Sequence, residues 1–167
     1  MYAKRLESGH DMHRAEFNMP NISMQQVDSF VRNFDTKSTD PLVESMTVIS
    51  RDETHKYPSV TRIITKIPMM TKRESIMAMK RMELPSGEVC WLSNTIEHPD
   101  YPKNDQYVRI DWFKGMKFSP QPDGSMSVTE FLQFDMGGYF PVSMLNMIQT
   151  NAVSKETQEL FDGMSKE

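Results

Sequence analysis

The histidines, the single cysteine and a glycine pair are the residues whose spacing could indicate chemistry. His10 and His13 are three residues apart, but on the strand expected there this spacing puts them on opposite faces, and no third metal ligand is indicated. No surrounding sequence marks Cys90 as a nucleophile. Gly137 and Gly138 lack the glycine spacing of a dinucleotide-binding loop. We therefore expect no metal, no cofactor and no catalysis, although carboxylates that pair only in space remain an open alternative.

The composition is that of a globular chain with an unusual amount of methionine. The 167 residues carry a net charge of -4, which favours neither nucleic acid nor an anionic membrane. Methionine occurs 16 times and suits adaptable apolar surfaces, although free use of methionine by the lineage explains the count equally well. One cysteine, no signal-peptide pattern and no membrane-spanning run predict one cytoplasmic domain over residues 1–167, with at most transient membrane contact.

Alternating apolar and polar residues predict a long series of β-strands around one short helix. Ser23 is expected to cap this helix over 24–33, where Val27 and Phe30 share the apolar face. The expected strands span 1–9, 11–19, 42–51, 59–67, 74–84, 88–98, 107–118 and 126–136. Because the connections are short, the strands are expected to pair antiparallel in one curved sheet of an α+β fold.

A second helix is expected over about 140–164. Met144 and Ile148 begin an apolar series at three- and four-residue spacing, and this stripe must lie on the sheet. The strands at 76–82 and 88–98 carry apolar residues on both faces, so they need cover on both faces or line an interior space. An apolar cavity beneath the helix and a solid core both satisfy this pattern.

Three segments carry motifs of a known family. They are KIPMMTKRE at 66–74, YVR at 107–109 with Gly115 and Pro120 downstream, and VT at 128–129 followed by DMGGYFP at 135–141. In order and spacing they are similar to a strand-loop-strand junction, a following strand, and the entry to a lid helix. On these segments the chain resembles the START domains, the lipid-transfer domains related to steroidogenic acute regulatory protein. The match extends over nearly the whole chain.

The resemblance implies a helix-grip fold, START or Bet v 1-like, in which a curved antiparallel sheet wraps around a long C-terminal helix. It also implies a cavity for one lipid, gated by that helix and an adjacent loop. Carried over by strand phase, the residues expected to face the lipid are Met77, Met79, Trp91, Ser93, Thr95, Thr129, Phe131, Gln133, Met144, Met147 and Ile148. Those expected at the gate and the membrane surface are Pro68, Met69, Met70, Gly137, Gly138, Tyr139 and Phe140. The hydroxyl and amide side chains among the lipid-facing residues are expected to contact a headgroup, although ordinary core positions explain them equally well.

The chain departs from the family in ways that bear on the ligand. Met79 stands where sterol-binding members place an arginine, so a phospholipid or another acyl lipid is favoured over a sterol. Trp91 stands where ceramide-binding members use a polar amide. The family's N-terminal helix and one further strand have no counterpart here, which predicts a short or truncated form with one sheet edge exposed.

Three functions fit this pattern. Non-catalytic binding and intracellular transfer of a single lipid is favoured, with a membrane surface as a transient partner and no nucleic acid. The alternative is an interaction module whose cavity has collapsed and whose exposed edge allows self-association. An enzyme acting on a small hydrophobic substrate is the third, and it needs a convergent polar pair inside the cavity.

Overall fold

The computed structural model describes residues 2–5, 11–33, 42–138 and 162. Its elements are β1 (Tyr2–Arg5), β2 (Asp11–Met19), α1 (Met24–Arg32), β3 (Val43–Arg51), β4 (Pro58–Thr65), β5 (Arg73–Glu83), β6 (Val89–Thr95), β7 (Val108–Arg109), β8 (Asp111–Pro120) and β9 (Met126–Asp135). The strands form one sheet in the order β1-β2-β9-β8-β6-β5-β4-β3, and β7 pairs with β5 beside this path. The helix expected over 140–164 lies outside the described residues.

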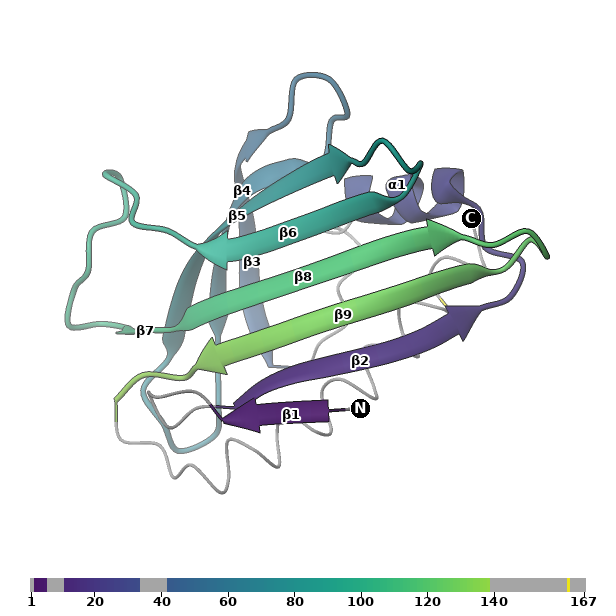
Figure 1. Cartoon of the computed structure of the whole chain (residues 1–167). Helices are drawn as coiled ribbons and strands as arrows, with labels where there is room; N and C mark the ends of the chain where they lie inside the picture. The colour runs from purple at the N-terminus through teal and green to yellow at the C-terminus, as the bar shows by residue number, and fades with distance from the viewer. Residues whose placement is uncertain (1, 6–10, 34–41, 139–161, 163–167) are drawn as a thin grey trace.

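The sheet is strongly curved. Figure 1 shows β6, β8, β9 and β2 in front, with the end of β5 beside β6, and β3, β4 and α1 behind this layer. All neighbours along the main path pair antiparallel, as the short connections predicted. The expected α+β class with one curved antiparallel sheet is confirmed. Within the described part of the chain, β1 and β3 are the two edge strands.

The strand expected over 107–118 is divided, and this corrects the sequence-based boundary. β7 ends at Arg109 and β8 begins at Asp111. β6 ends at Thr95, opposite Met77 of β5. The first residues of β5 therefore have no β6 residues beside them to accept or donate backbone hydrogen bonds. β7 fills this edge by parallel pairing, and the N–H of Val108 donates to the carbonyl of Lys72 at 3.0 Å. The division therefore satisfies backbone groups that would otherwise lose their partners.

The helix α1 forms where the capping pattern predicted it. The Ser23 hydroxyl accepts a hydrogen bond from the N–H of Gln26, and the Gln26 side chain accepts one from the N–H of Ser23. Val27 and Phe30 are buried on the face that meets the sheet. The helix therefore covers one end of the concave face and does not cover the other end.

A charged network lies on the convex face, behind the start of β5. Glu74 is 2% exposed, and its carboxylate oxygens lie 2.7 Å from Nε of Arg62 and 3.0 Å from a guanidinium nitrogen of Arg109. The Arg62 guanidinium also lies over the rings of Tyr101 and Tyr107, with its carbon 4.8 Å and 5.5 Å from their centroids. This network fastens the loop between β6 and β7 to the outside of the sheet.

Candidate functional site

Two apolar clusters cover the concave face, one at each end of the strands. The first cluster consists of Met19, Ile22, Val27, Phe30, Tyr57, Val89, Trp91, Met116, Phe118, Met126 and Val128. The second cluster consists of Ala15, Ile110, Leu132, Phe134 and Met136, with Phe17, Ile67 and Trp112 packed against it. Because α1 contributes Val27 and Phe30 only to the first cluster, that end of the concave face is filled by the described chain itself.

An ion pair lies between the two clusters. Lys114 on β8 pairs in register with Leu132 of the second cluster, and Glu130 on β9 pairs with Met116 of the first. The Lys114 ammonium lies 3.1 Å from the Glu130 carboxylate, and the two side chains are 12% and 1% exposed. Removing two charges from water costs free energy, so an ion pair on a largely apolar face marks this position as a candidate functional site.

Further hydrogen-bond donors surround this ion pair. Ser93 on β6 lies directly opposite Lys114, and Trp112 precedes Lys114 by two residues on the same face of β8. Within the part of the chain that the structure describes, the indole nitrogens of Trp91 and Trp112 are buried without a hydrogen-bond acceptor. Trp112 stacks on Phe134 with a centroid distance of 5.5 Å. The middle of the concave face is therefore polar, and it is rich in donors.

Arg81 anchors α1 to the first cluster. Its guanidinium lies 3.0 Å from the Asp28 carboxylate of α1, and its carbon is 6.0 Å from the centroid of Trp91. Burial lowers the pKa of Arg81, but hydrogen bonds to Asp28 and Glu83 outweigh it and raise the pKa overall. Burial also raises the pKa of Tyr57, whose ring meets Trp91 edge-on at 4.8 Å. This end of the face is therefore closed by packing and fixed charges.

The rim of the second cluster is formed by the loop between β4 and β5. Ile67 packs against the cluster, and its carbonyl accepts a hydrogen bond from the N–H of Met70 at 3.2 Å. Between them, Met69 is fully exposed at 105% and has a φ of 61°. An apolar side chain held in water at a loop tip is unusual unless it meets another surface.

The glycine pair lies at the same end of the sheet. Gly137 and Gly138 both have a φ of 64°. The N–H of Gly137 donates to Oδ1 of Asp135 at 2.8 Å. A Cβ at Gly137 would lie 2.5 Å from the carbonyl oxygen of Arg109, so the chain passes directly over β7 here. Because β7 pairs with the start of β5, this crossing lies beside the rim loop.

The predicted gate residues that the structure describes thus gather at one end of the sheet, and a gating role stays a prediction for all of them. These residues are Pro68, Met69, Met70, Gly137 and Gly138. The other predicted gate residues, Tyr139 and Phe140, lie outside the described residues, as do the predicted lipid contacts Met144, Met147 and Ile148.

Four of the predicted lipid contacts lie on the concave face. The register places Met79 beside Ser93, Ser93 beside Lys114, and Trp91 beside Met116. Met77 follows the same alternation on β5. Trp91 is packed in the first cluster, whereas Met79 is only partly buried there and also lines an open groove of about 580 Å³ where β4 separates from β5. Their contact with a lipid stays a prediction.

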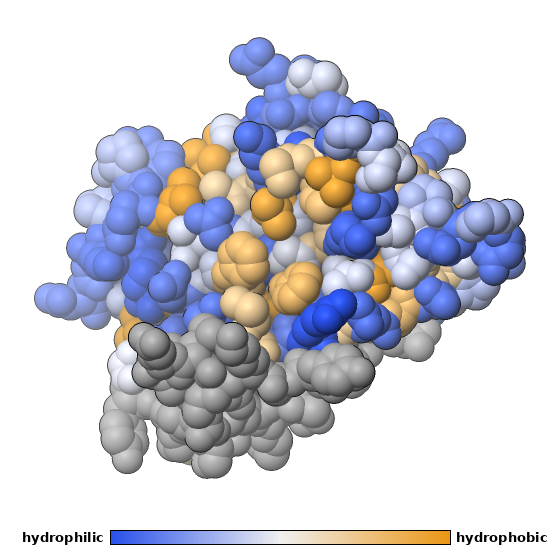
Figure 2. Space-filling model, viewed as in Figure 1, coloured by the Kyte–Doolittle hydropathy of each residue, from blue (hydrophilic) through white to orange (hydrophobic). Residues whose placement is uncertain are grey.

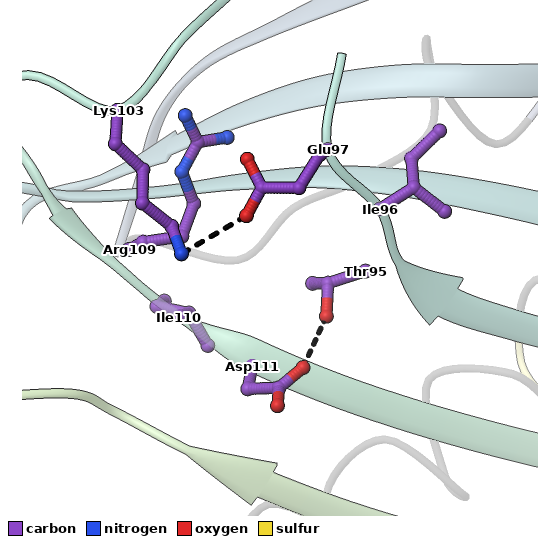
Figure 3. A pocket seen from close by; sticks show the side chains of 7 residues that line it. All are labelled: Thr95, Ile96, Glu97, Lys103, Arg109, Ile110 and Asp111. Carbon is purple, nitrogen blue, oxygen red and sulfur yellow. Dashed lines mark hydrogen bonds and ion pairs between the residues drawn. The ribbon is translucent and has the colours of Figure 1, made fainter.

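Thr95 differs from its neighbours on β6. Its hydroxyl donates to the carboxylate of Asp111 and accepts from the N–H of Trp112 at 3.1 Å. Figure 3 shows this contact in a pocket of about 240 Å³, lined by Thr95, Ile96, Glu97, Lys103, Arg109, Ile110 and Asp111. The structure therefore does not place the Thr95 hydroxyl on the concave face, contrary to the expectation that it contacts a headgroup there.

The expected phase of β9 is wrong. Thr129, Phe131 and Gln133 alternate with the buried residues of this strand and lie on the convex face. Phe131 is 37% exposed there, beneath the guanidinium of Arg14. Figure 2 looks at this face and shows a few apolar side chains among hydrophilic ones. The expectation came from the strand phase that the resemblance implied, and the burial pattern of β9 shows the opposite phase, with Glu130 inside.

The polar residues that matter most on the concave face were missed. Lys114 and Glu130 belong to strands whose other inward residues are apolar, so a hydropathy pattern counts them as outward-facing. The available signal was the strict alternation of Val128, Leu132 and Phe134, which leaves position 130 inside. Their mutual neutralisation could be recognised only after the strands were paired.

The described ranges hold neither a membrane-spanning helix nor a cluster of metal ligands. No helix among these residues is long and apolar enough to cross a bilayer. No group of three or more His, Cys, Asp or Glu side chains among them is placed to hold a metal ion.

Comparison with solved structures identifies the fold. No protein-family model and no curated protein sequence matches the chain. Human StAR-related lipid transfer protein 5 matches it with a TM-score of 0.77 and 17% identity, over 98% of this chain and 80% of that one. The chain has the START fold.

Other START structures extend this likeness. The STAR-related lipid transfer protein from Xanthomonas axonopodis has a TM-score of 0.77 and 16% identity, over 98% of this chain and 92% of that one. Human STARD10 has a TM-score of 0.75 and 18% identity over 93% of this chain, which spans 64% of the STARD10 chain. The START-like resemblance found in the sequence is therefore confirmed at the level of the fold.

Proposed function

We propose that this chain binds one acyl lipid on the concave face of its sheet and carries it between membranes without changing it chemically. The observation that supports this most strongly is the likeness to human StAR-related lipid transfer protein 5 over 98% of the chain. The second cluster supplies apolar surface for the lipid. Each buried methylene contributes about 0.8 kcal/mol, so an acyl chain binds without any reaction.

Lipid uptake by the purified chain tests this proposal. We expect native mass spectrometry, after incubation with dioleoylphosphatidylcholine vesicles containing 10% dioleoylglycerol, to show one added lipid mass per chain. Substitution of Ser93 by phenylalanine fills the middle of the concave face and is expected to reduce the occupied fraction at least tenfold. The matched control is Asn94→Phe, because Asn94 is exposed and occupies the other face of the same strand.

Two results would contradict the proposal. A spectrum with only the unmodified chain would exclude lipid binding, and a dimer without lipid would favour the interaction module instead. Equal occupancy in the Ser93→Phe and Asn94→Phe variants would remove the concave face as the binding site. Thermal unfolding of both variants separates loss of binding from loss of the fold.

We further propose that the rim loop enters the membrane surface when lipid is exchanged. Met69 offers an apolar side chain at the loop tip, beside the second cluster and the glycine pair. Substitution of Met69 by glutamate is expected to slow transfer between phosphatidylcholine vesicles about tenfold, because a carboxylate resists entry into the interface. Fluorescence dequenching of a labelled lipid measures this rate.

The control for Met69 lies in the turn between β5 and β6. Ser86 is also exposed, but it lies at the opposite end of β5, so Ser86→Glu is expected to leave the transfer rate unchanged. Equilibrium occupancy with lipid delivered from cyclodextrin should be the same in both variants. Equal transfer rates for the Met69→Glu variant and the unsubstituted chain would exclude the proposed membrane contact.

A further inference from the structure

The ion pair on the concave face is not required by the packing of the sheet. Glu130 is 1% exposed and Lys114 is 12% exposed. The residues around them are apolar except for Ser93 and the buried His13, which lies opposite Leu132 on β2. Buried ion pairs of this kind can often be replaced by well-packed apolar residues at no cost in stability. Two apolar residues at positions 114 and 130 would therefore stabilise the fold as well as the two charges do. Binding of a polar ligand group would explain why charged residues are found there.

The groups around the ion pair indicate the chemistry of that ligand. The hydroxyl side chain of Ser93 faces the same way as Lys114, and the buried indole nitrogen of Trp112 has no acceptor among the described residues. A buried donor without an acceptor loses the free energy of its bond to water. A ligand with several uncharged acceptor oxygens, such as acyl carbonyls, would supply such an acceptor.

The charge balance of the junction disfavours an anionic headgroup. Glu130 already neutralises Lys114 at 3.1 Å, so a phosphate bound to the ammonium would also lie within a few ångströms of the carboxylate. Like charges repel strongly where water is excluded. A hydroxyl matches the pair better, because its oxygen accepts a hydrogen bond from Lys114 while its hydrogen is donated to Glu130.

We infer that the junction of Lys114, Glu130, Ser93 and Trp112 is a recognition site for the headgroup of a neutral acyl lipid with a free hydroxyl and acyl carbonyls, such as a diacylglycerol. This inference rests on the proposed function and narrows its ligand. The hydroxyl lies between Lys114 and Glu130, a carbonyl accepts from the Trp112 indole, and the acyl chains lie along the second cluster.

A competition between headgroups tests the inference. The full chain is incubated with dioleoylphosphatidylcholine vesicles that contain 10% dioleoylglycerol and 10% dioleoylphosphatidic acid, and native mass spectrometry identifies the bound lipid. Relative to its share of the vesicles, dioleoylglycerol is expected to be enriched at least tenfold over both phospholipids. Equal or greater binding of either phospholipid would overturn the inference while leaving lipid binding intact. Absence of any bound lipid would refute the proposed function itself, and the inference with it.

Substitutions at the junction connect the preference to the two charges. The double variant Lys114→Met with Glu130→Leu removes both charges together, so neither is left buried alone, and it is expected to bind lipid with less than twofold preference. Glu130→Gln keeps the size of the side chain and removes the repulsion, so binding of dioleoylphosphatidic acid is expected to rise at least tenfold. Lys117→Met is the control, because Lys117 lies on the convex face of β8 and pairs with Glu88 at 2.7 Å. A double variant that keeps the tenfold preference, or no gain in the Glu130→Gln variant, would overturn the inference.

Discussion

Substitution of Glu74 by alanine is expected to lower the free energy of unfolding by about 3–5 kcal/mol, the range for removing one partner of a buried charge network. Glu74 is 2% exposed and neutralises both Arg62 and Arg109, which are 24% and 14% exposed. Without the carboxylate, two guanidinium groups remain partly buried and repel each other. Urea unfolding followed by circular dichroism measures the loss.

A surface pair of the same chemistry provides the control. Glu44 lies 2.7 Å from the ammonium of Lys72, but the two side chains are 35% and 44% exposed. Water screens this pair, so Glu44→Ala is expected to cost about 0.5 kcal/mol or less. Similar losses in the two variants would mean that burial does not strengthen the Glu74 network, and would contradict the role assigned to it in fastening the loop between β6 and β7.

Substitution of Gly137 by alanine is expected to lower the free energy of unfolding by about 3 kcal/mol. Its φ of 64° costs an alanine about 1 kcal/mol. The added Cβ would also lie 2.5 Å from the carbonyl oxygen of Arg109 and 2.9 Å from a methyl group of Val108. Since a backbone atom cannot move aside without breaking the pairing of β7 with β5, the clash adds to the torsional cost. Urea unfolding again measures the difference.

The neighbouring glycine separates the two contributions. Gly138 has the same φ of 64°, but the nearest atom to an added Cβ is a methyl group of Val108 at 3.7 Å, an ordinary contact distance. Gly138→Ala is therefore expected to cost about 1 kcal/mol, the torsional part alone. If both variants lose the same stability, the close passage of the chain over β7 does not constrain the fold.

Much of the architecture could be predicted from local pattern. The strand expected over 88–98, for example, forms as β6 over Val89–Thr95. Ser23 and Gln26 likewise specify the start of α1 through their own hydrogen bonds. The three motif segments at 66–74, 107–120 and 128–141 together suggested the START fold, which the comparison with solved structures confirmed.

The site was harder to predict than the fold, for a reason visible at two strands. Phe131 on β9 is apolar and lies outside, whereas Glu130 is charged and lies inside. Hydropathy assigns each residue to a face by its own transfer free energy, but the free energy of burying Glu130 depends on Lys114 on the neighbouring strand. The break at Ile110 has a similar origin, because β7 forms to pair with the open edge of β5.

The sequence by itself determined most of the strands and the capped helix α1, because each depends on interactions within a few residues. Only the tertiary structure decided which residues of β9 face inward and that a lysine and a glutamate meet between two apolar clusters. Both features depend on how the strands pair, because the free energy of burying a charge is set by partners that are distant in the chain.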